Sequence, residues 1–180
     1  MNAMQSPMSS SQTSPLSPVL DHWPLVGACA SAAMLAAAHA FETFGGLAPC
    51  HLCYYQRDVY WAGVSVGVLG FALGYMRLRW ADRAADLLLA VIFLVGAGVA
   101  AYHSGVEWKW WPGPSSCTGA GMVNAGDLTA FLDGGKVRPP RCDEAAWRMF
   151  GLSMAGYNTL ASLVLVALSV LAARRDRPHD

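Results

Sequence analysis

Residues 87–104 read LLLAVIFLVGAGVAAYHS, an uninterrupted run of 18 residues without a formal charge. A helix of about 20 predominantly apolar residues crosses a bilayer core, so this run is long enough to span a membrane. Three other runs have the same character, and the only formal charge inside any of the four is Glu42. Because lipid cannot hydrogen-bond open backbone groups, each run must be helical. We predict spans at residues 23–44, 59–76, 87–104 and 151–173.

The composition of the whole chain agrees with this prediction. Of the 180 residues, 54% are apolar and 13% are charged, whereas soluble domains carry about 25% charged residues. Twelve Lys and Arg balance twelve Asp and Glu, so no basic field is present to recruit nucleic acid. The sequence excludes a soluble enzyme with one buried core. It predicts an all-α membrane protein, a four-helix transmembrane antiparallel bundle in which close helix packing is favoured by Gly63, Gly67, Gly70 and Gly74.

The basic residues predict the orientation of the bundle. Lys and Arg total six on each side, but on one side half of them lie in the middle of the long segment 105–150, far from the span ends, where charges influence topology less. The other side has its arginines close to the span ends. We therefore place both termini in the cytoplasm and the segments 45–58 and 105–150 outside it. The arginines that decide this are Arg77, Arg79, Arg83, Arg174, Arg175 and Arg177.

The chain divides into one membrane domain and two tails. Residues 1–20 are rich in Ser, Pro, Met and Gln and carry no charge, so they bury too little apolar surface to order themselves. We predict a disordered cytoplasmic tail over residues 1–20, a transmembrane domain over 21–175 and a second cytoplasmic tail over 176–180.

Four of the five cysteines fall in the two segments placed outside the cytoplasm: Cys50, Cys53, Cys117 and Cys142. Cys29 lies inside the first predicted span, where a free thiol is expected to be a buried packing residue. Thiols beyond the cytoplasmic membrane meet an oxidising compartment, and an even number of them indicates disulfides. The topology and the cysteine positions therefore agree.

Metal binding and purely structural disulfides are the alternatives for these four cysteines. Zinc favours close pairs, or close pairs with histidines, whereas Cys117 and Cys142 are 25 positions apart. A c-type haem needs a histidine after C-x-x-C, and here His51 lies inside the motif. A C-x-x-C ring closes little chain entropy, so it is a poor structural link. Its bond is strained and exchanges easily, which favours redox chemistry.

The residues around Cys53 strengthen this interpretation. Pro49 precedes the pair and residues from Tyr54 onward are compatible with a helix, so the thiols are expected near a helix N-terminus, where the dipole favours a thiolate. Arg57 follows Cys53 by four residues, on the same helical face. A cation there stabilises a thiolate or polarises a bound carbonyl oxygen. The alternative is that Arg57 only extends to lipid head groups.

Residues 49–57, PCHLCYYQR, resemble the active-site signature of the DsbB family of disulfide-forming membrane proteins. The second half of the chain adds GPSSC at 113–117 and GLSMA at 151–155, and the resemblance runs from about residue 23 to the end of the fourth span. Only the N-terminal tail falls outside the family pattern. Further matching residues are Cys142, Asp143, Glu144, Trp147 and Asn158.

The resemblance implies an enzyme, a protein-disulfide:quinone oxidoreductase of the bacterial inner membrane. Such a protein reoxidises a periplasmic DsbA-type dithiol protein and passes the electrons to ubiquinone or menaquinone, with no metal. The implied redox disulfides are Cys50–Cys53 and Cys117–Cys142. The partner attacks Cys117, and Cys142 then attacks Cys50. Cys53 and Arg57 are expected to meet the quinone.

Other residues admit two interpretations each. His103 ends the third span on the outer side, where it approaches the quinone head group or is simply interfacial. His39 and Glu42 end the first span at the same level, where polar groups are functional candidates or interfacial residues. Residues 127–132 suit a short helix on the membrane surface. An interfacial aromatic belt is predicted from Trp108, Trp110 and Trp111.

Two rival functions remain at this point. A b-type quinone-linked cytochrome would use His39 and His103 as axial haem ligands, which requires them to face each other in the bundle. It leaves the four outer cysteines unexplained. A membrane scaffold with purely structural disulfides is the second rival, and it predicts no thiol oxidase activity.

Overall fold

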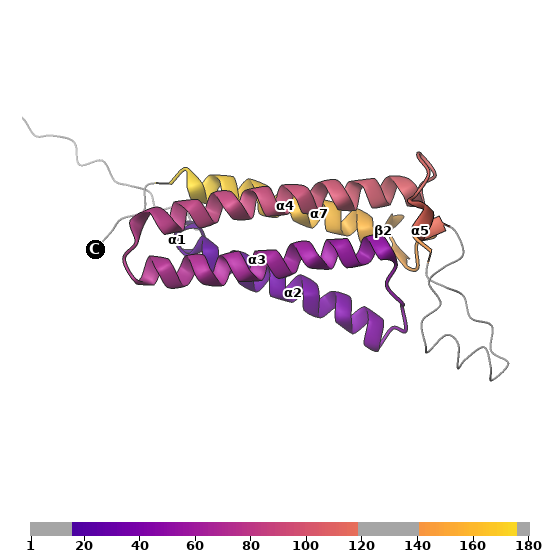
Figure 1. Ribbon diagram of the computed structural model, residues 1–180, viewed down its shortest axis with the longest axis horizontal. Helices are drawn as coiled ribbons and strands as arrows, with labels where there is room; N and C mark the ends of the chain where they lie inside the picture. Colours follow the sequence, from indigo (N-terminus) through magenta and orange to yellow (C-terminus); the bar gives the residue numbers. More distant parts are fainter. Residues whose placement is uncertain (1–15, 119–140, 176–180) are drawn as a thin grey trace, which may run out of the picture.

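A computed structural model describes residues 16–118 and 141–175 of the chain. Four long helices account for most of them (Figure 1). The only strands among the described residues form one short antiparallel pair. In chain order the elements are α1 (Ser17–Asp21), α2 (Trp23–Thr43), α3 (His51–Tyr75), α4 (Arg79–Glu107), α5 (Ser115–Thr118), β1 (Arg148–Met149), β2 (Leu152–Ser153) and α7 (Met154–Ala173).

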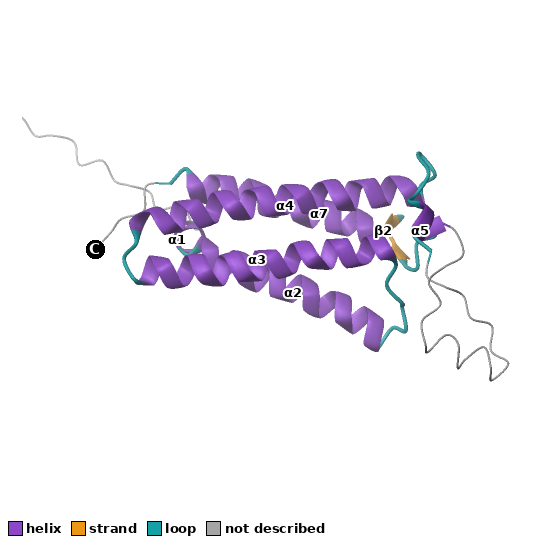
Figure 2. Cartoon of the chain, in the orientation of Figure 1, coloured by secondary structure: helices purple, strands orange, loops and turns teal. Residues whose placement is uncertain are grey.

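The long helices pack in sequence, α2 on α3, α3 on α4 and α4 on α7. Successive helices run in opposite directions, so the α2–α3 connection lies at the same end as the segment between α4 and α7 (Figures 1 and 2). The α3–α4 turn and the described chain ends lie at the other end. Cys50, Cys53, Cys117 and Cys142 are therefore gathered at one end of the molecule.

The four predicted spans are all helical, but the helices differ from them at their ends. The helix α3 begins at His51, eight residues before the predicted span, because Cys50 caps it: the Cys50 sulfur accepts a hydrogen bond from the Cys53 amide at 3.4 Å. The helix α4 starts at Arg79 and runs to Glu107. The predicted ten-residue link between the second and third spans is thus a short turn, with Arg77 at a φ of 62°.

Three of the helices are long and apolar enough to cross a membrane: α2, α4 from Trp80 onward, and α7. The helix α3 is less apolar, because its first turns carry Gln56, Arg57 and Asp58. Large apolar side chains are exposed along the outside of the helices, a surface that a soluble protein rarely presents but that suits lipid. Examples are Val68, Leu69, Leu88, Val91, Leu94, Val95, Leu160, Leu163 and Val164. The described fold is that of a helical membrane protein.

The predicted glycine face lies where α3 packs closely against neighbouring helices. A Cβ atom added at Gly67 would lie 2.5 Å from the Pro24 carbonyl oxygen, and one added at Gly63 would meet the Ser31 hydroxyl. Both contacts bring α3 onto α2. Beside them, Trp23 and Phe93 are almost completely buried. The indole Nε1 of Trp23 donates to the Ser169 hydroxyl of α7 at 2.9 Å.

The last residues of the predicted N-terminal tail are helical. Residues 17–20, assigned to a disordered segment, belong to α1, whose Leu20 is buried in the apolar core. Asp21 at the end of α1 lies 3.5 Å from the Arg175 guanidinium, just after α7. This contact and the burial of Leu20 supply the order that composition alone does not predict. Residues 1–15, 119–140 and 176–180 lie outside the described residues, and with them the helix predicted at 127–132.

The start of the fourth span also needs correction, because residues 151–153 are not helical. They belong to a hairpin in which Arg148 pairs with Ser153 and Met149 with Leu152. The two turn residues, Phe150 and Gly151, have φ values of 49° and 83°, the left-handed conformation that two-residue hairpin turns require. The helix α7 starts after the hairpin, where the Ser153 hydroxyl accepts from the Gly156 amide at 3.2 Å.

Candidate active site

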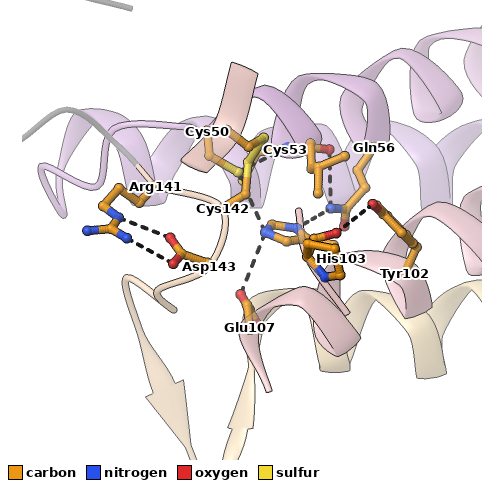
Figure 3. Close-up of a disulfide and its surroundings, with 12 residues drawn as sticks. Cys50, Cys53, Gln56, Tyr102, His103, Glu107, Arg141, Cys142 and Asp143 are labelled. Atoms are coloured by element: carbon orange, nitrogen blue, oxygen red, sulfur yellow. Dashed lines mark hydrogen bonds and ion pairs between the residues drawn. A yellow bond between two sulfur atoms is a disulfide. The ribbon is translucent and has the colours of Figure 1, made fainter. Parts of the chain in front are cut away.

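The C-x-x-C motif lies at the first turn of α3. Cys50 is the N-cap residue and Cys53 completes the turn, so their sulfur atoms are only 2.8 Å apart, as free thiols (Figure 3). Both precede Val59, where the predicted span begins. The hydrogen bond between the two sulfurs raises the pKa of the Cys50 thiol and lowers the pKa of the Cys53 thiol. Cys53 is therefore the sulfur that ionises first.

The second pair lies directly against the first. A disulfide joins Cys117 of α5 to Cys142, with a Cα–Cα distance of 5.2 Å, and both residues are buried. The Cys142 sulfur, the Cys50 sulfur and the Nε2 atom of His103 all lie within 4.8 Å of one another. Because the Cys142 sulfur is held in the disulfide, this group offers a metal only two free ligands. Its geometry suits exchange between the two cysteine pairs instead.

His103 reaches this site from α4 and is buried. Its Nε2 atom is 3.6 Å from the Cys50 sulfur, and its Nδ1 atom is 2.8 Å from the Gln56 amide nitrogen (Figure 3). The main chain of Cys142 also hydrogen-bonds the ring. His103 therefore contacts both cysteine pairs, whereas His39 is half exposed at the end of α2, with its Nδ1 3.8 Å from Glu42. The two histidines have separate partners, which is not the arrangement of a haem ligand pair.

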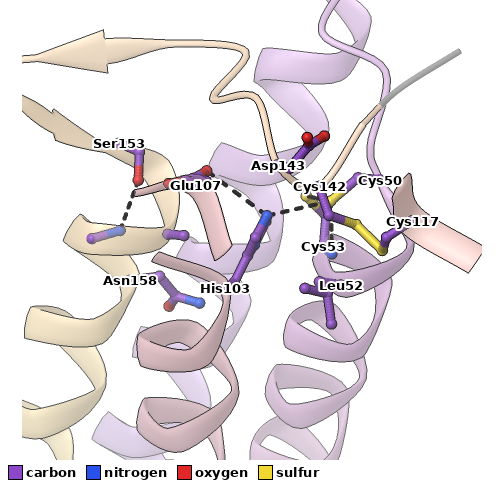
Figure 4. A network of polar contacts seen from close by, with 12 residues as sticks. Cys50, Leu52, Cys53, His103, Glu107, Cys117, Cys142, Asp143, Ser153 and Asn158 are labelled. Atoms are coloured by element: carbon purple, nitrogen blue, oxygen red, sulfur yellow. Dashed lines mark hydrogen bonds and ion pairs between the residues drawn. A yellow bond between two sulfur atoms is a disulfide. The ribbon is translucent and has the colours of Figure 1, made fainter. Parts of the chain in front are cut away.

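Glu107, one turn after His103, was missed by the sequence interpretation. Its side chain is buried, and its Oε1 atom lies 3.8 Å from His103 Nε2 (Figure 4). The residue lies beyond the predicted end of the span, so its charge looked like that of an ordinary loop residue. The signal that could have found it is the i, i+4 spacing from His103, which places both side chains on one helical face.

Arg57 is held by α2. Its guanidinium donates to the Glu42 carboxylate at 2.6 Å and to the Ala38 carbonyl at 3.2 Å, and it lies 5.6 Å from the centre of the Tyr54 ring. Only 12% of the Arg57 side chain is exposed, which disfavours simple extension to lipid head groups. Glu42 is thus the residue that orients Arg57.

The outer rim of the site is polar and aromatic. Asp143, next to Cys142, accepts hydrogen bonds from Arg141 and Lys109, and these bonds lower the pKa of its carboxyl to about 2. Trp111 stacks on Tyr102 at a centroid distance of 5.9 Å. Trp108, Trp110 and Trp111 are all exposed, as the predicted aromatic belt requires.

Cys29 differs from its predicted role. It is exposed on α2, because the neighbouring positions Ala28 and Ser31 carry the face that packs against α3. Cys29 thus takes no part in the site.

The helical bundle is apolar, and at one end it brings a C-x-x-C thiol pair against a second, disulfide-bonded pair. These two features define a class of protein: membrane proteins that carry out thiol–disulfide exchange. Comparison with known proteins agrees. A family model described as disulfide bond formation protein DsbB matches residues 21–172, and the chain belongs to the DsbB family.

Individual relatives are similar over nearly their whole length. Disulfide bond formation protein B of Dechloromonas aromatica is 32% identical over 152 residues, covering 80% of this chain and 87% of the relative. The protein of that name from Xanthomonas oryzae pv. oryzae is also 32% identical, over 86% of this chain and 92% of its own. The protein of that name from Marinobacter nauticus is 29% identical, over 83% of this chain and 89% of its own.

Proposed function

We propose that residues 21–175 form a thiol oxidase that takes two electrons from a periplasmic DsbA-type protein and delivers them to a membrane quinone, sustaining protein disulfide formation. The observation that carries this proposal is the meeting of two cysteine pairs, in which the sulfurs of Cys142 and Cys50 lie within 4.8 Å. Electrons that enter at the Cys117–Cys142 pair can therefore pass to the Cys50–Cys53 pair after only a short movement of the Cys142 sulfur toward Cys50. We place the chain in the bacterial inner membrane with both termini in the cytoplasm.

The first half-reaction is dithiol oxidation at Cys117. A partner thiolate attacks the Cys117 sulfur, the Cys117–Cys142 bond breaks, and Cys142 leaves as a thiolate. The second partner thiol attacks the mixed disulfide, which frees Cys117 and leaves the partner oxidised. The exposed side chains of Lys109 and Arg141 lie beside Asp143, next to Cys142, and the partner has to displace the chain around the buried Cys117 to reach its sulfur.

The second half-reaction moves the electrons to the C-x-x-C pair. The Cys142 thiolate attacks Cys50 of a Cys50–Cys53 disulfide and Cys53 leaves as a thiolate. Cys117 then attacks Cys142, which restores the Cys117–Cys142 disulfide and frees Cys50. The lowered pKa of Cys53 makes it the better leaving group of its pair.

The residues near Cys53 suit a quinone head group. Arg57 shares the helical face of Cys53, and its bonds to described residues use two of the five N–H donors of a guanidinium. The remaining donors are available to a carbonyl oxygen, and His103 lies beside Cys50, with its Nε2 atom 3.6 Å from the Cys50 sulfur. Ubiquinone or menaquinone supplies the acceptor for two electrons and two protons, and the Cys50–Cys53 disulfide forms again.

The test is reoxidation of a reduced DsbA-type protein by the purified chain, with and without added quinone. We expect rapid, quinone-dependent oxidation by the native chain, and none by the Cys53→Ser variant. The Cys29→Ser variant is the matched control, because Cys29 is exposed on α2 away from the site, and it should retain full activity. Oxidation that needs neither quinone nor Cys53 would contradict the proposal, and no oxidation at all would favour a scaffold with structural disulfides.

A further inference from the structure

The helix α4 ends in a turn whose shape favours glycine, but a lysine occupies it. The Trp110 amide donates to the Gly105 carbonyl at 2.9 Å, and the Lys109 amide donates to the Val106 carbonyl at 3.1 Å. These are the two bonds of a Schellman motif, in which the residue after the C-cap has a left-handed backbone. Lys109 has a φ of 62°, a conformation that glycine adopts without steric cost and other residues do not. The presence of lysine at this position points to a use for its side chain.

The Lys109 side chain connects the end of α4 to the segment that carries Cys142. Its ammonium group donates to the Asp143 carbonyl oxygen at 2.7 Å and to the Asp143 carboxylate at 2.6 Å. Asp143 directly follows Cys142 (Figure 3). Because the pKa of the Asp143 carboxyl is about 2, the ion pair persists at any pH near neutrality. Lys109 thus holds the main chain next to the Cys142 sulfur.

These contacts do not depend on the redox state of Cys142, because they join nitrogen and oxygen atoms only. The Cys117–Cys142 disulfide is different, since the proposed reaction opens it. The Cys142 amide also donates to the Cys117 carbonyl at 3.3 Å, but the partner has to displace the chain around Cys117 and that bond with it. While the disulfide is open, the contacts that hold Cys142 to the bundle are therefore those made outside Cys117.

Another anchor of this segment lies farther from Cys142. Trp147 packs on Phe41 of α2 and on Tyr157 of α7, with ring centroids 5.5 Å and 6.1 Å apart. It follows Cys142 by five residues, and five residues of extended chain reach about 17 Å. In the folded site, by contrast, the sulfurs of Cys142 and Cys50 lie within 4.8 Å (Figure 4). The anchor at Trp147 alone would let the Cys142 sulfur move well away from its target.

We propose that Lys109 is a positioning residue that keeps the Cys142 thiolate beside Cys50 while the disulfide of Cys142 is open. This inference rests on the proposed function and adds no chemical step to it. The Cys142 thiolate still attacks Cys50, the Cys50–Cys53 bond breaks, and Cys53 leaves as a thiolate. Lys109 acts on the rate of this attack, because two groups held close together react far more often than groups that must first find each other.

The test follows exchange between the two cysteine pairs in the full chain. The oxidised protein is mixed with a DsbA-type partner that lacks its second cysteine, quenched with acid at successive times, and alkylated with N-ethylmaleimide. Among chains with the partner attached at Cys117, peptide mass analysis gives the ratio of Cys142 bonded to Cys50 to Cys142 that is alkylated. This exchange ratio reports how quickly Cys142 attacks Cys50.

Replacing Lys109 should lower the exchange ratio without weakening the fold. In Lys109→Gly we expect the ratio at early times to fall about three- to tenfold. The fall is partial because the ion pair is exposed and because the ring of His103 still hydrogen-bonds the Cys142 main chain. Glycine also relieves the left-handed backbone, so Lys109→Gly should unfold in detergent at a temperature equal to or above that of the native chain. A purely structural role would lower both values.

Two further variants test the nature of the contact. Lys109→Arg, which keeps the positive charge and the reach, should recover part of the exchange ratio. Lys109→Met, which keeps the length without the charge, should lower the ratio as Lys109→Gly does. If Lys109→Gly does not fold, Lys109→Met takes its place, and an unchanged ratio in that variant overturns the inference.

Arg141 provides the matched control. Its guanidinium also pairs with the Asp143 carboxylate, at 2.9 Å, and is exposed, but it belongs to the same segment as Asp143 and so does not connect it to α4. Arg141→Gln should leave the exchange ratio at the native value. The inference is wrong if Lys109→Gly matches the native chain, if Arg141→Gln lowers the ratio equally, or if ratio and unfolding temperature fall together. Failure of the proposed function is distinguishable, because the native chain would then form no adduct at Cys117.

Discussion

At the scale of single residues, the site is organised by partners that come from other helices. Arg57 is oriented by Glu42 of α2, and His103 by Gln56 of α3. Sequence alone identified Arg57 as a candidate from its spacing to the C-x-x-C motif, and His103 from its position at the end of the third predicted span. It could not assign partners, because contacts between side chains 15 and 47 positions apart depend on how the helices pack.

Removing Arg57 should impair the quinone step selectively. A lost hydrogen bond to a charged group costs about 1.5–3 kcal/mol, which corresponds to a roughly ten- to hundredfold slower step or weaker quinone affinity. Arg57→Lys should recover only part, since lysine lacks the planar fork, and Glu42→Gln should give a smaller loss. Steady-state kinetics at varied quinone concentration measures this, with the exposed Arg83→Ala as control. Unchanged quinone kinetics in Arg57→Ala would remove this residue from the site.

The order of cysteine attack can be trapped. A DsbA-type partner that lacks its second cysteine cannot resolve a mixed disulfide, so it should remain attached to Cys117 on a non-reducing gel. Peptide mapping should then find Cys142 bonded to Cys50, its near neighbour. The Cys117→Ser variant should give no such adduct. An adduct on Cys50 instead would reverse the proposed order.

At the scale of elements, the close approach of α3 to α2 depends on glycine residues, which have no side chain. Gly67→Ala places a methyl group 2.5 Å from the main-chain oxygen of Pro24, and overpacking of this kind costs about 1–3 kcal/mol. We expect a lower unfolding temperature in detergent, followed by circular dichroism. The matched control is Gly98→Ala in α4, where a methyl group meets no atom within 4 Å. Equal effects of the two substitutions would show that close packing at Gly67 is unimportant.

Helix existence was predictable from the sequence, and helix ends were not. The four apolar runs sufficed to identify α2, α3, α4 and α7. The apolar pattern stops at Val59, however, and the capped start of α3 at Cys50 depends on a single sulfur–amide contact. The hairpin before α7 depends on the left-handed backbone at Phe150 and Gly151, which hydropathy does not register.

At the scale of the whole molecule, the proposed topology is directly testable. A reporter that is active only outside the cytoplasm should give signal when fused after Gly126, and none after Arg79 or Arg175. Arg79 and Arg175 lie at the opposite end of the bundle from the cysteines. The reverse pattern of signal would place the cysteines in a reducing compartment and contradict the proposed redox function.

The reacting groups all lie at one end of the bundle: both cysteine pairs, His103 and Arg57. This placement determines how strongly the membrane potential acts on the proposed reaction. An elementary charge that crosses the full bilayer gains or loses about 2.3 kcal/mol per 100 mV of membrane potential. In this bundle the proposed electron path runs from Cys117 to the first two turns of α3 and stays at one end of the helices, so we expect the charges to cross little of that field. Turnover in proteoliposomes should therefore be insensitive to an imposed potassium diffusion potential of either sign. A cell could then continue to form disulfides while its respiratory membrane is depolarised.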